Sequence, residues 1–274
     1  MTWREDDFEK NPKNKPTYTS DINIVASIPD FNMVSEVLYF LSQGKDKDFI
    51  NKEIFDKNIY GIRTLRSRKR FLAAIYVNFI KFQNEDHKKV FYALFLQQTL
   101  LDLKKIVLFI QFAINNQLFF DLTSNITMKL YKEGRLSVPK EEYTSYLYAL
   151  REKSEDLQSW SNATIDIIAS KYLTLLKKLG FLKGSIKKEF CSVDIDNRVL
   201  VYLVYLLKSL NYSNPDIMKN PLINILPITK ENLFLRIKKL SLSGYFKIYT
   251  LGEDLKIELN YKYEDIVNVI IQND

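Results

Sequence analysis

Apolar residues recur every three or four positions along most of the chain, the pattern of helices that bury one face. The segment 160–184 shows this most clearly. Ser161, Asn162 or Thr164 can accept a hydrogen bond from a free N–H of the first turn. Gly180 stands where a helix ends in the left-handed conformation. Between them runs one apolar stripe, composed of Ile165, Ile168, Ala169, Tyr172, Leu175, Leu176 and Leu179. The segment predicts a capped helix that continues into an extended piece, as in the third helix and wing of a winged helix-turn-helix. A plain core helix with a good C-cap has the same pattern.

The N-terminal part predicts a polar tail, residues 1–16, followed by a helix-turn-helix-like unit, residues 17–84. β-Branched residues over 18–28 favour a short extended piece. Three helices are then expected: one capped by Asp30 or Asn32 and stopped by Gly44, a shorter one over 45–58, and a third over 60–82. Because the third helix is basic at its start, its N-terminal half could lie against a nucleic-acid duplex.

Residues 85–158 predict a central helical core. The stretch 85–131 is helical in pattern and strongly apolar, so it is either the buried centre of the protein or a face that meets a partner. Pro139 opens a further helix over 140–153. The polar connector 153–159 is the best candidate for a domain boundary.

Residues 159–274 predict a C-terminal region with winged-helix-like units. Thr229 can cap a helix, and alternation of apolar and polar residues over 245–261 predicts a β-hairpin after it. Between these and the helix of 160–184 we expect a strand-like piece, a buried helix and a loop-rich stretch, over 190–195, 199–210 and 211–227. The predicted fold is mainly α, multi-helical, with helix-turn-helix or winged-helix-like units and a small C-terminal β-hairpin.

Composition is that of an ordinary soluble globular protein. Of the 274 residues, 46% are hydrophobic and 27% are charged, and the seven glycines and seven prolines are few, which favours long helices. The single Cys191 leaves no disulfide within the chain and fits a reducing cytosol. The first 16 residues lack the apolar run of a signal peptide, and the longest uncharged apolar run, 199–207, is far short of about 20 residues. We expect a cytoplasmic protein that does not cross a membrane.

Charge points to an acidic partner. The formal net charge is +7, which favours nucleic acid first and an anionic membrane surface second, although background composition alone can make a protein basic. Five cations lie within residues 63–70, and no acidic residue occurs from Tyr60 to Gln83. Long cationic side chains also solvate the exposed face of a core helix. The candidate DNA-binding residues are Arg63, Thr64, Arg66, Arg68, Lys69 and Arg70, with Lys177, Lys178, Lys183, Arg236, Lys238 and Lys239 as secondary contacts.

Enzymatic chemistry has little support in the sequence. His87 lies in a polar stretch, where a surface turn or a helix start is expected, and one His with one Cys cannot build their usual metal site. No glycine-rich phosphate loop is present. Asp216 together with Asp254 and Lys256 loosely resembles the set of a Mg²⁺-dependent nuclease, but Asp216 is equally a helix cap. We expect no enzyme activity, cofactor, metal or small-molecule substrate.

The chain resembles the BrxA family of BREX phage-defence systems in bacteria. Trp160-Ser161, a Thr three residues later, and a helix that ends in Leu-Gly-Phe-Leu at 179–182 carry the resemblance. Tyr18-Thr19-Ser20 before the first long helix and the Thr- and Arg-rich segment 63–70 agree with it. The resemblance spans residues 18–207. It implies a mostly helical, non-enzymatic defence component with winged-helix-like parts that bind nucleic acid.

Two functions follow as expectations. The first is binding of double-stranded DNA mainly through its phosphate backbone, with weak sequence preference and steep salt dependence. The second is a protein–protein adaptor within the same defence complex, in which the aromatic helices of residues 91–119 form the interface with other proteins of that complex.

Overall fold

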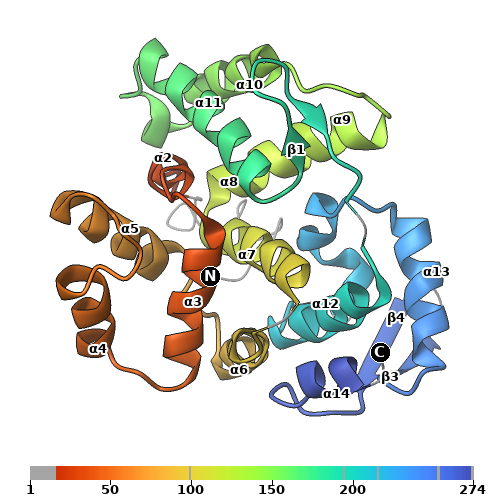
Figure 1. Ribbon diagram of the computed structural model, residues 1–274. Coiled ribbons are helices and arrows are strands. Elements are labelled where there is room, and N and C mark those ends of the chain that lie inside the picture. The colour runs from red at the N-terminus through yellow and green to blue at the C-terminus, as the bar shows by residue number, and fades with distance from the viewer. Residues whose placement is uncertain (1–16, 99, 194, 215, 252–253, 273–274) are drawn as a thin grey trace. The chain divides into compact units, whose positions relative to one another are not determined.

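The computed structural model describes residues 17–272 except 99, 194, 215, 252 and 253. The predicted polar tail and the tip of the predicted hairpin lie outside the described residues. Over the rest, the structure is mainly helical with two small antiparallel ribbons (Figure 1). The mainly α prediction and the C-terminal hairpin are confirmed.

Two compact units are assembled from separated stretches of the chain. Among the described residues, the larger unit consists of 17–81 and 105–193. Among the described residues, the smaller unit consists of 82–104 and those from 195 onward, so the division falls within α7 (Leu101–Asn115). These units alternate along the chain, whereas the segments 17–84, 85–158 and 159–274 expected from the sequence are contiguous. The expected boundary at 153–159 lies inside the larger unit.

The larger unit contains most of the helices. The helices before α7 are α2 (Asp21–Ala26), α3 (Phe31–Ser42), α4 (Lys47–Asn51) with the π-helical η2 (Lys52–Asp56), and α5 (Leu65–Asn78). The elements after α7 are α8 (Gln117–Leu122), the π-helical η3 (Thr123–Thr127), α9 (Met128–Lys132), α10 (Lys140–Lys153), η4 (Glu155–Leu157), α11 (Asn162–Lys178), β1 (Leu182–Lys183) and β2 (Glu189–Phe190). The strands β1 and β2 pair antiparallel.

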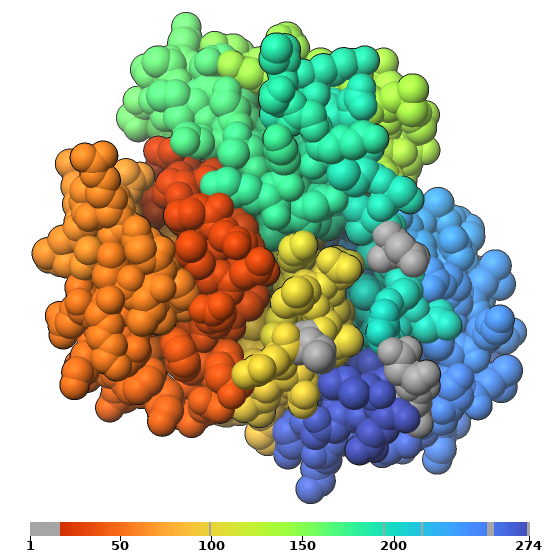
Figure 2. All heavy atoms as spheres, viewed as in Figure 1, coloured from red at the N-terminus to blue at the C-terminus, as the bar shows by residue number. Residues whose placement is uncertain are grey.

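The segment 18–28 is mostly helical, so the prediction of an extended piece is wrong. Ile22, Val25 and Ala26 in α2 are buried, because α2 packs against both α5 and α11. Figure 2 shows the red surface of α2 and α3 between the orange surface of α4 and α5 and the green surface of α11. Burial of a helical face at spacings of three and four outweighs the extended preference of β-branched residues.

Helix α11 forms as predicted, and its two ends explain why. The Ser161 hydroxyl accepts a hydrogen bond from the Thr164 backbone N–H at 3.2 Å. Gly180 has a φ of 88°, and the N–H groups of Gly180 and Phe181 donate to the carbonyls of Lys177 and Leu176. This is a Schellman ending, in which the last carbonyls of the helix find partners. The Phe181 ring stacks on Phe109 with 4.2 Å between ring centroids.

The smaller unit is arranged around α12 (Asn197–Ser209), whose apolar residues are buried on nearly every side. Helices α6 (Glu85–Leu96), α13 (Lys230–Ser241) and α14 (Ile266–Gln272) pack against it. Two 3₁₀ turns, η5 (Ile217–Lys219) and η6 (Pro221–Ile225), occupy the stretch that was expected to be loops or short turns. The Tyr202 hydroxyl donates to the Val90 carbonyl at 3.1 Å and so links α12 to α6.

The C-terminal ribbon follows the predicted alternation. Strand β3 (Phe246–Leu251) pairs with β4 (Asp254–Leu259), with Phe246 opposite Leu259 and Ile248 opposite Ile257. Phe246 and Ile257 are buried, while Lys247 and Glu258 face solvent. Helix and ribbon occur in winged-helix order in both units, but a winged-helix or helix-turn-helix geometry stays a prediction.

No single helix of the described residues is long and apolar enough to span a membrane. Within the same described residues, α7 and the segment 117–132 would together reach the length and composition of a membrane span, but they meet at a bend of 116°.

Candidate nucleic-acid interface

The exposed side of α5 carries a row of cations. Thr64 caps this helix, since its hydroxyl oxygen accepts a hydrogen bond from the Ser67 N–H at 3.1 Å. The helix therefore begins at Leu65, whereas the sequence predicted a start at Tyr60. Its buried face, Phe71, Leu72 and Ile75, fixes which residues point outward. The outward cations are Arg66, Lys69 and Arg70, with Arg63 exposed just before the helix.

These four side chains form no ion pair with another described residue. Ion pairs among the described residues involve other cations, such as Lys57 with Glu53 and Lys140 with Asp166. The spacing of three and four residues places Arg66, Lys69 and Arg70 on neighbouring positions of one helix surface. Their positive potential is therefore concentrated and directed to solvent, as binding to a phosphate backbone requires.

Arg68 is turned inward. Its Nε donates to the carbonyl of Ile62 at 2.9 Å, and its Nη1 donates to the carbonyl of Phe55 at 2.7 Å. The guanidinium thus joins the end of η2 to the loop before α5. Of the cations predicted from residues 63–70, Arg68 is the one that the structure half-buries.

The lysines near the end of α11 divide in the same way. Lys178 Nζ donates to the carbonyl of Ala26 at 2.8 Å and to that of Ile28, which satisfies free carbonyls at the end of α2. Burial, with a smaller effect of Lys171, lowers the pKa of Lys178. Lys177 and Lys183 are exposed.

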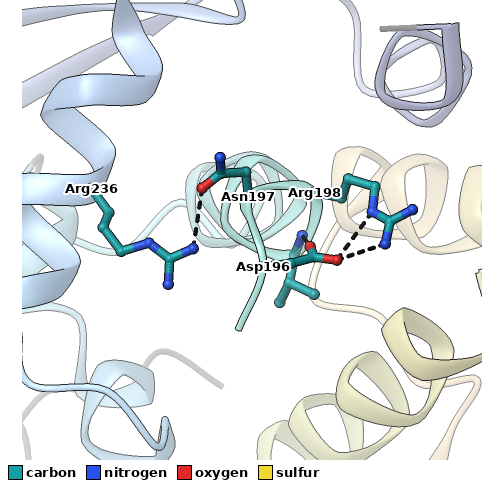
Figure 3. A network of polar contacts seen from close by, with 5 residues as sticks. Asp196, Asn197, Arg198 and Arg236 are labelled. Carbon is teal, nitrogen blue, oxygen red and sulfur yellow. Dashed lines mark hydrogen bonds and ion pairs between the residues drawn. The ribbon is translucent and has the colours of Figure 1, made fainter. Parts of the chain in front are cut away.

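The predicted contacts of the smaller unit lie on α13. Lys238 and Lys239 face solvent, whereas Arg236 Nη2 donates to the Asn197 side-chain oxygen at 3.1 Å (Figure 3). This hydrogen bond ties α13 to the first residue of α12. Arg236, Lys238 and Lys239 belong to the smaller unit, and the other nine predicted residues belong to the larger one.

Asp196 and Arg198 lie at the start of α12 and were not among the residues predicted from the sequence. One Asp196 oxygen accepts from the Val199 N–H at 2.9 Å, and the other accepts from Arg198 Nε and Nη2 at 3.1 and 2.8 Å (Figure 3). Burial raises the pKa of Asp196, but the hydrogen bonds from Val199 and Arg198 outweigh it and leave the pKa below its usual value. The sequence signal was an Asp three residues before Val199, an ordinary helix cap.

The acidic and histidine candidates are structural. His87 begins α6 as expected, but its side chain is fully buried against Phe82, so the prediction of a surface position is wrong. Asp216 is buried and accepts from the Met218 N–H at 2.9 Å, which is the cap interpretation. Within the described part of the chain, no three His, Cys, Asp or Glu residues are grouped to hold a metal ion.

The aromatic helices of residues 91–119 form the interior. Phe91, Phe95, Phe109, Phe112 and Phe119 are all fully buried. Of the two interpretations left open by the sequence, the buried centre is confirmed. These five rings are therefore not exposed to a partner, and the adaptor function itself stays a prediction.

Comparisons with known proteins agree with the resemblance in sequence. The family model described as BrxA matches residues 31–205, from α3 into α12. The crystal structure of an uncharacterized protein from Magnetospirillum magneticum is similar, with a TM-score of 0.54 at 17% sequence identity over 71% of this chain and 98% of that chain. At this identity the similarity shows a shared fold alone. No curated protein matches the chain.

Proposed function

The chain belongs to the BrxA family, a component of bacterial BREX phage-defence systems, and from this premise we propose that it binds double-stranded DNA mainly through the phosphate backbone. The proposal is one of binding without catalysis. Other proteins of the same defence system are its expected partners.

One observation supports DNA binding most strongly: the row of unpaired cations on α5. Arg66, Lys69 and Arg70 share one exposed surface, and Arg63 stands beside it at the start of the helix. Arginine presents a planar fork that matches two phosphate oxygens. Phosphate contacts of this kind position a duplex without reading its sequence, so weak sequence preference is expected.

The inward cations take a supporting part in this proposal. Arg68 fixes the loop before α5, and Lys178 fixes the connector after α2, so neither is assigned a DNA contact. Lys177 and Lys183 in the larger unit, and Lys238 and Lys239 in the smaller, stay secondary candidates. Each is exposed.

Fluorescence anisotropy with a labelled duplex tests the proposal. The triple variant Arg66→Ala, Lys69→Ala, Arg70→Ala should bind at least about 10-fold more weakly than wild type at low salt. A matched variant removes three exposed cations elsewhere in the larger unit, namely Lys129, Arg135 and Lys153. Equal losses of duplex affinity in both variants would reject α5 as the contact and would attribute the binding to net charge alone.

The adaptor function is the second candidate, and the outer face of α13 favours it. Leu235 and Leu242 are 63% and 87% exposed, and Lys238 and Lys239 lie between them on the same face. An apolar stripe with flanking cations suits a partner that offers apolar and acidic side chains. Amide exchange that is slowed in α13 by co-expressed proteins of the defence system, and unchanged by duplex DNA, would support this function over DNA binding.

A further inference from the structure

A groove of about 410 Å³ lies beside the basic row, within the larger unit. One wall is the connector between α2 and α3, residues 27–29, and the opposite wall is the start of α5 with the loop before it. The volume lies in the usual range of small-molecule sites, about 300–1,000 Å³. It is large enough for one nucleotide and too small for a duplex.

The lining of the groove combines two chemistries. Ile28, Met33, Ile62 and Phe71 line it with apolar side chains, of which Met33 is half-buried and the other three are buried. Arg63 and Arg70 line the same groove, and neither forms an ion pair with a described residue. No carboxylate is among the described residues that line it. The groove therefore favours an anionic ligand that also carries an apolar, planar part.

Ser67 adds a hydrogen-bond donor to this lining. Its hydroxyl oxygen accepts a hydrogen bond from the Thr64 hydroxyl at 2.9 Å, which leaves the hydroxyl hydrogen of Ser67 available. A hydroxyl hydrogen beside two guanidinium groups suits a phosphate, which accepts several hydrogen bonds at once.

Both walls are held in place by the cations that turn inward. Arg68 binds the carbonyls of Ile62 and Phe55, and thereby fixes the loop that carries Arg63. Lys178 binds the carbonyls of Ala26 and Ile28, and thereby fixes the opposite wall. A site whose supporting residues are fixed in advance loses less entropy when its ligand binds.

We propose that this groove binds a single nucleotide, with the phosphate on Arg63 and Arg70 and the base on the apolar wall of Met33 and Ile62. Two sources share this chemistry: a free nucleoside monophosphate and an unpaired nucleotide of bound DNA. The second source rests on the DNA binding proposed above, whereas the first does not.

Titration with deoxyadenosine monophosphate, followed by amide NMR shifts, tests the groove itself. Wild type should bind it, with the largest shifts in residues 61–71. The double variant Arg63→Ala, Arg70→Ala should weaken binding at least about 10-fold. The double variant Arg66→Ala, Lys69→Ala should keep it, because neither residue lines the groove. No binding to wild type at millimolar nucleotide, or equal losses in the two double variants, would overturn the proposal.

A filled groove gives a second test that leaves all cations in place. Met33→Trp should abolish nucleotide binding and leave the affinity for a fully paired duplex unchanged, with circular dichroism used to confirm folding. If Met33→Trp does not fold, the comparison of the two double variants, Arg63→Ala, Arg70→Ala and Arg66→Ala, Lys69→Ala, decides alone. Unchanged nucleotide binding by a folded Met33→Trp variant would overturn the proposal.

Duplex binding distinguishes a free nucleotide from an unpaired nucleotide of DNA as the ligand. It also distinguishes failure of the groove proposal from failure of the DNA-binding proposal. If the groove takes its nucleotide from DNA, a duplex with one unpaired nucleotide should bind about 10-fold more tightly than the fully paired duplex. The double variant Arg63→Ala, Arg70→Ala should bind both duplexes with equal affinity. Nucleotide binding without this difference assigns the groove to a free nucleotide. Paired-duplex binding without any nucleotide binding would overturn the groove and leave the DNA proposal standing.

Discussion

Arg68 and Lys178 are half-buried and direct their charged groups to backbone carbonyls of the larger unit. Each donates from one charged group to two backbone carbonyls, and each joins an irregular segment to a neighbouring helix. A hydrogen bond from a charged donor contributes about 1.5–3 kcal/mol to stability, and a buried carbonyl left without a partner carries a cost of similar size. These two cations are therefore expected to support the fold.

Arg68→Ala should lower the free energy of unfolding by about 2–3 kcal/mol, because two carbonyls lose their partner. Arg66→Ala, two residues away on the exposed side, should change it by no more than about 0.5 kcal/mol. Urea denaturation of both variants measures the difference. Equal stabilities would mean that the Arg68 hydrogen bonds contribute nothing.

Asp196 should make stability depend on acid pH. Because its pKa in the folded chain is below the usual value of about 3.9, its contribution is fully present above pH of about 4 and is lost as pH falls through the lower, folded pKa. Asp196→Asn keeps an N-cap but removes the charge. Urea unfolding at neutral and acid pH should therefore show a smaller acid loss in Asp196→Asn than in wild type. An identical loss in both would contradict the assignment.

Which cations face solvent could be predicted only in part from the sequence. The cluster itself is local, so Arg63, Arg66, Lys69 and Arg70 follow from spacing and from the absence of nearby acids. The inward turn of Arg68 depends on the Phe55 carbonyl, thirteen positions away and on another element. The burial of His87 likewise comes from packing, because its neighbours in sequence are polar.

Helix ends are the best predicted elements, because their signals are local. Ser161, Thr229 and Asp30 cap α11, α13 and α3 as the sequence predicts, and Gly180 ends α11. Helices that depend on packing against distant parts of the chain were not predicted. Helix α2 needs α5 and α11 to bury its face, and the seven-residue α14 needs α12 and α6. Short helices have little stability of their own.

Gly180→Ala should destabilise the chain by about 1–2 kcal/mol, since alanine is strained at a φ of 88°. Apart from Gly180 and its two chain neighbours, no described residue has an atom within 4 Å of the added Cβ, so the cost is conformational alone. Gly184→Ala should cost more, because its Cβ would stand 2.1 Å from the Lys187 carbonyl oxygen. Thermal unfolding of both variants tests the order, and a neutral Gly180→Ala would contradict the described ending of α11.

The arrangement of the whole chain into two alternating units could not be predicted from local patterns. The larger unit takes residues from both sides of 82–104, and the smaller unit joins that stretch to residues beyond 194. Contacts over such sequence distances leave no periodic signal. At this scale the net charge favours an acidic partner, because it is a sum over residues and does not depend on how they pack. That class of partner stays a prediction.

Most of the candidate cations lie in the larger unit, so DNA binding is expected to depend mainly on that unit. The larger unit holds the four unpaired cations at α5 together with Lys177 and Lys183, and the smaller unit holds Lys238 and Lys239. Each phosphate neutralised by a cation contributes about 0.9 to the slope of the logarithm of affinity against the logarithm of salt concentration. The slope therefore counts contacts directly.

The most direct measurement is that slope for a short duplex between about 50 and about 300 mM salt. Four contacts at α5 predict a slope of about −3.6 or steeper for wild type. The variant Arg66→Ala, Lys69→Ala, Arg70→Ala should be shallower by about 2.7, and the matched Lys129, Arg135 and Lys153 variant should equal wild type. Absence of binding at the lowest salt, or one slope for all three proteins, would contradict the assignment of α5 as a DNA-binding helix.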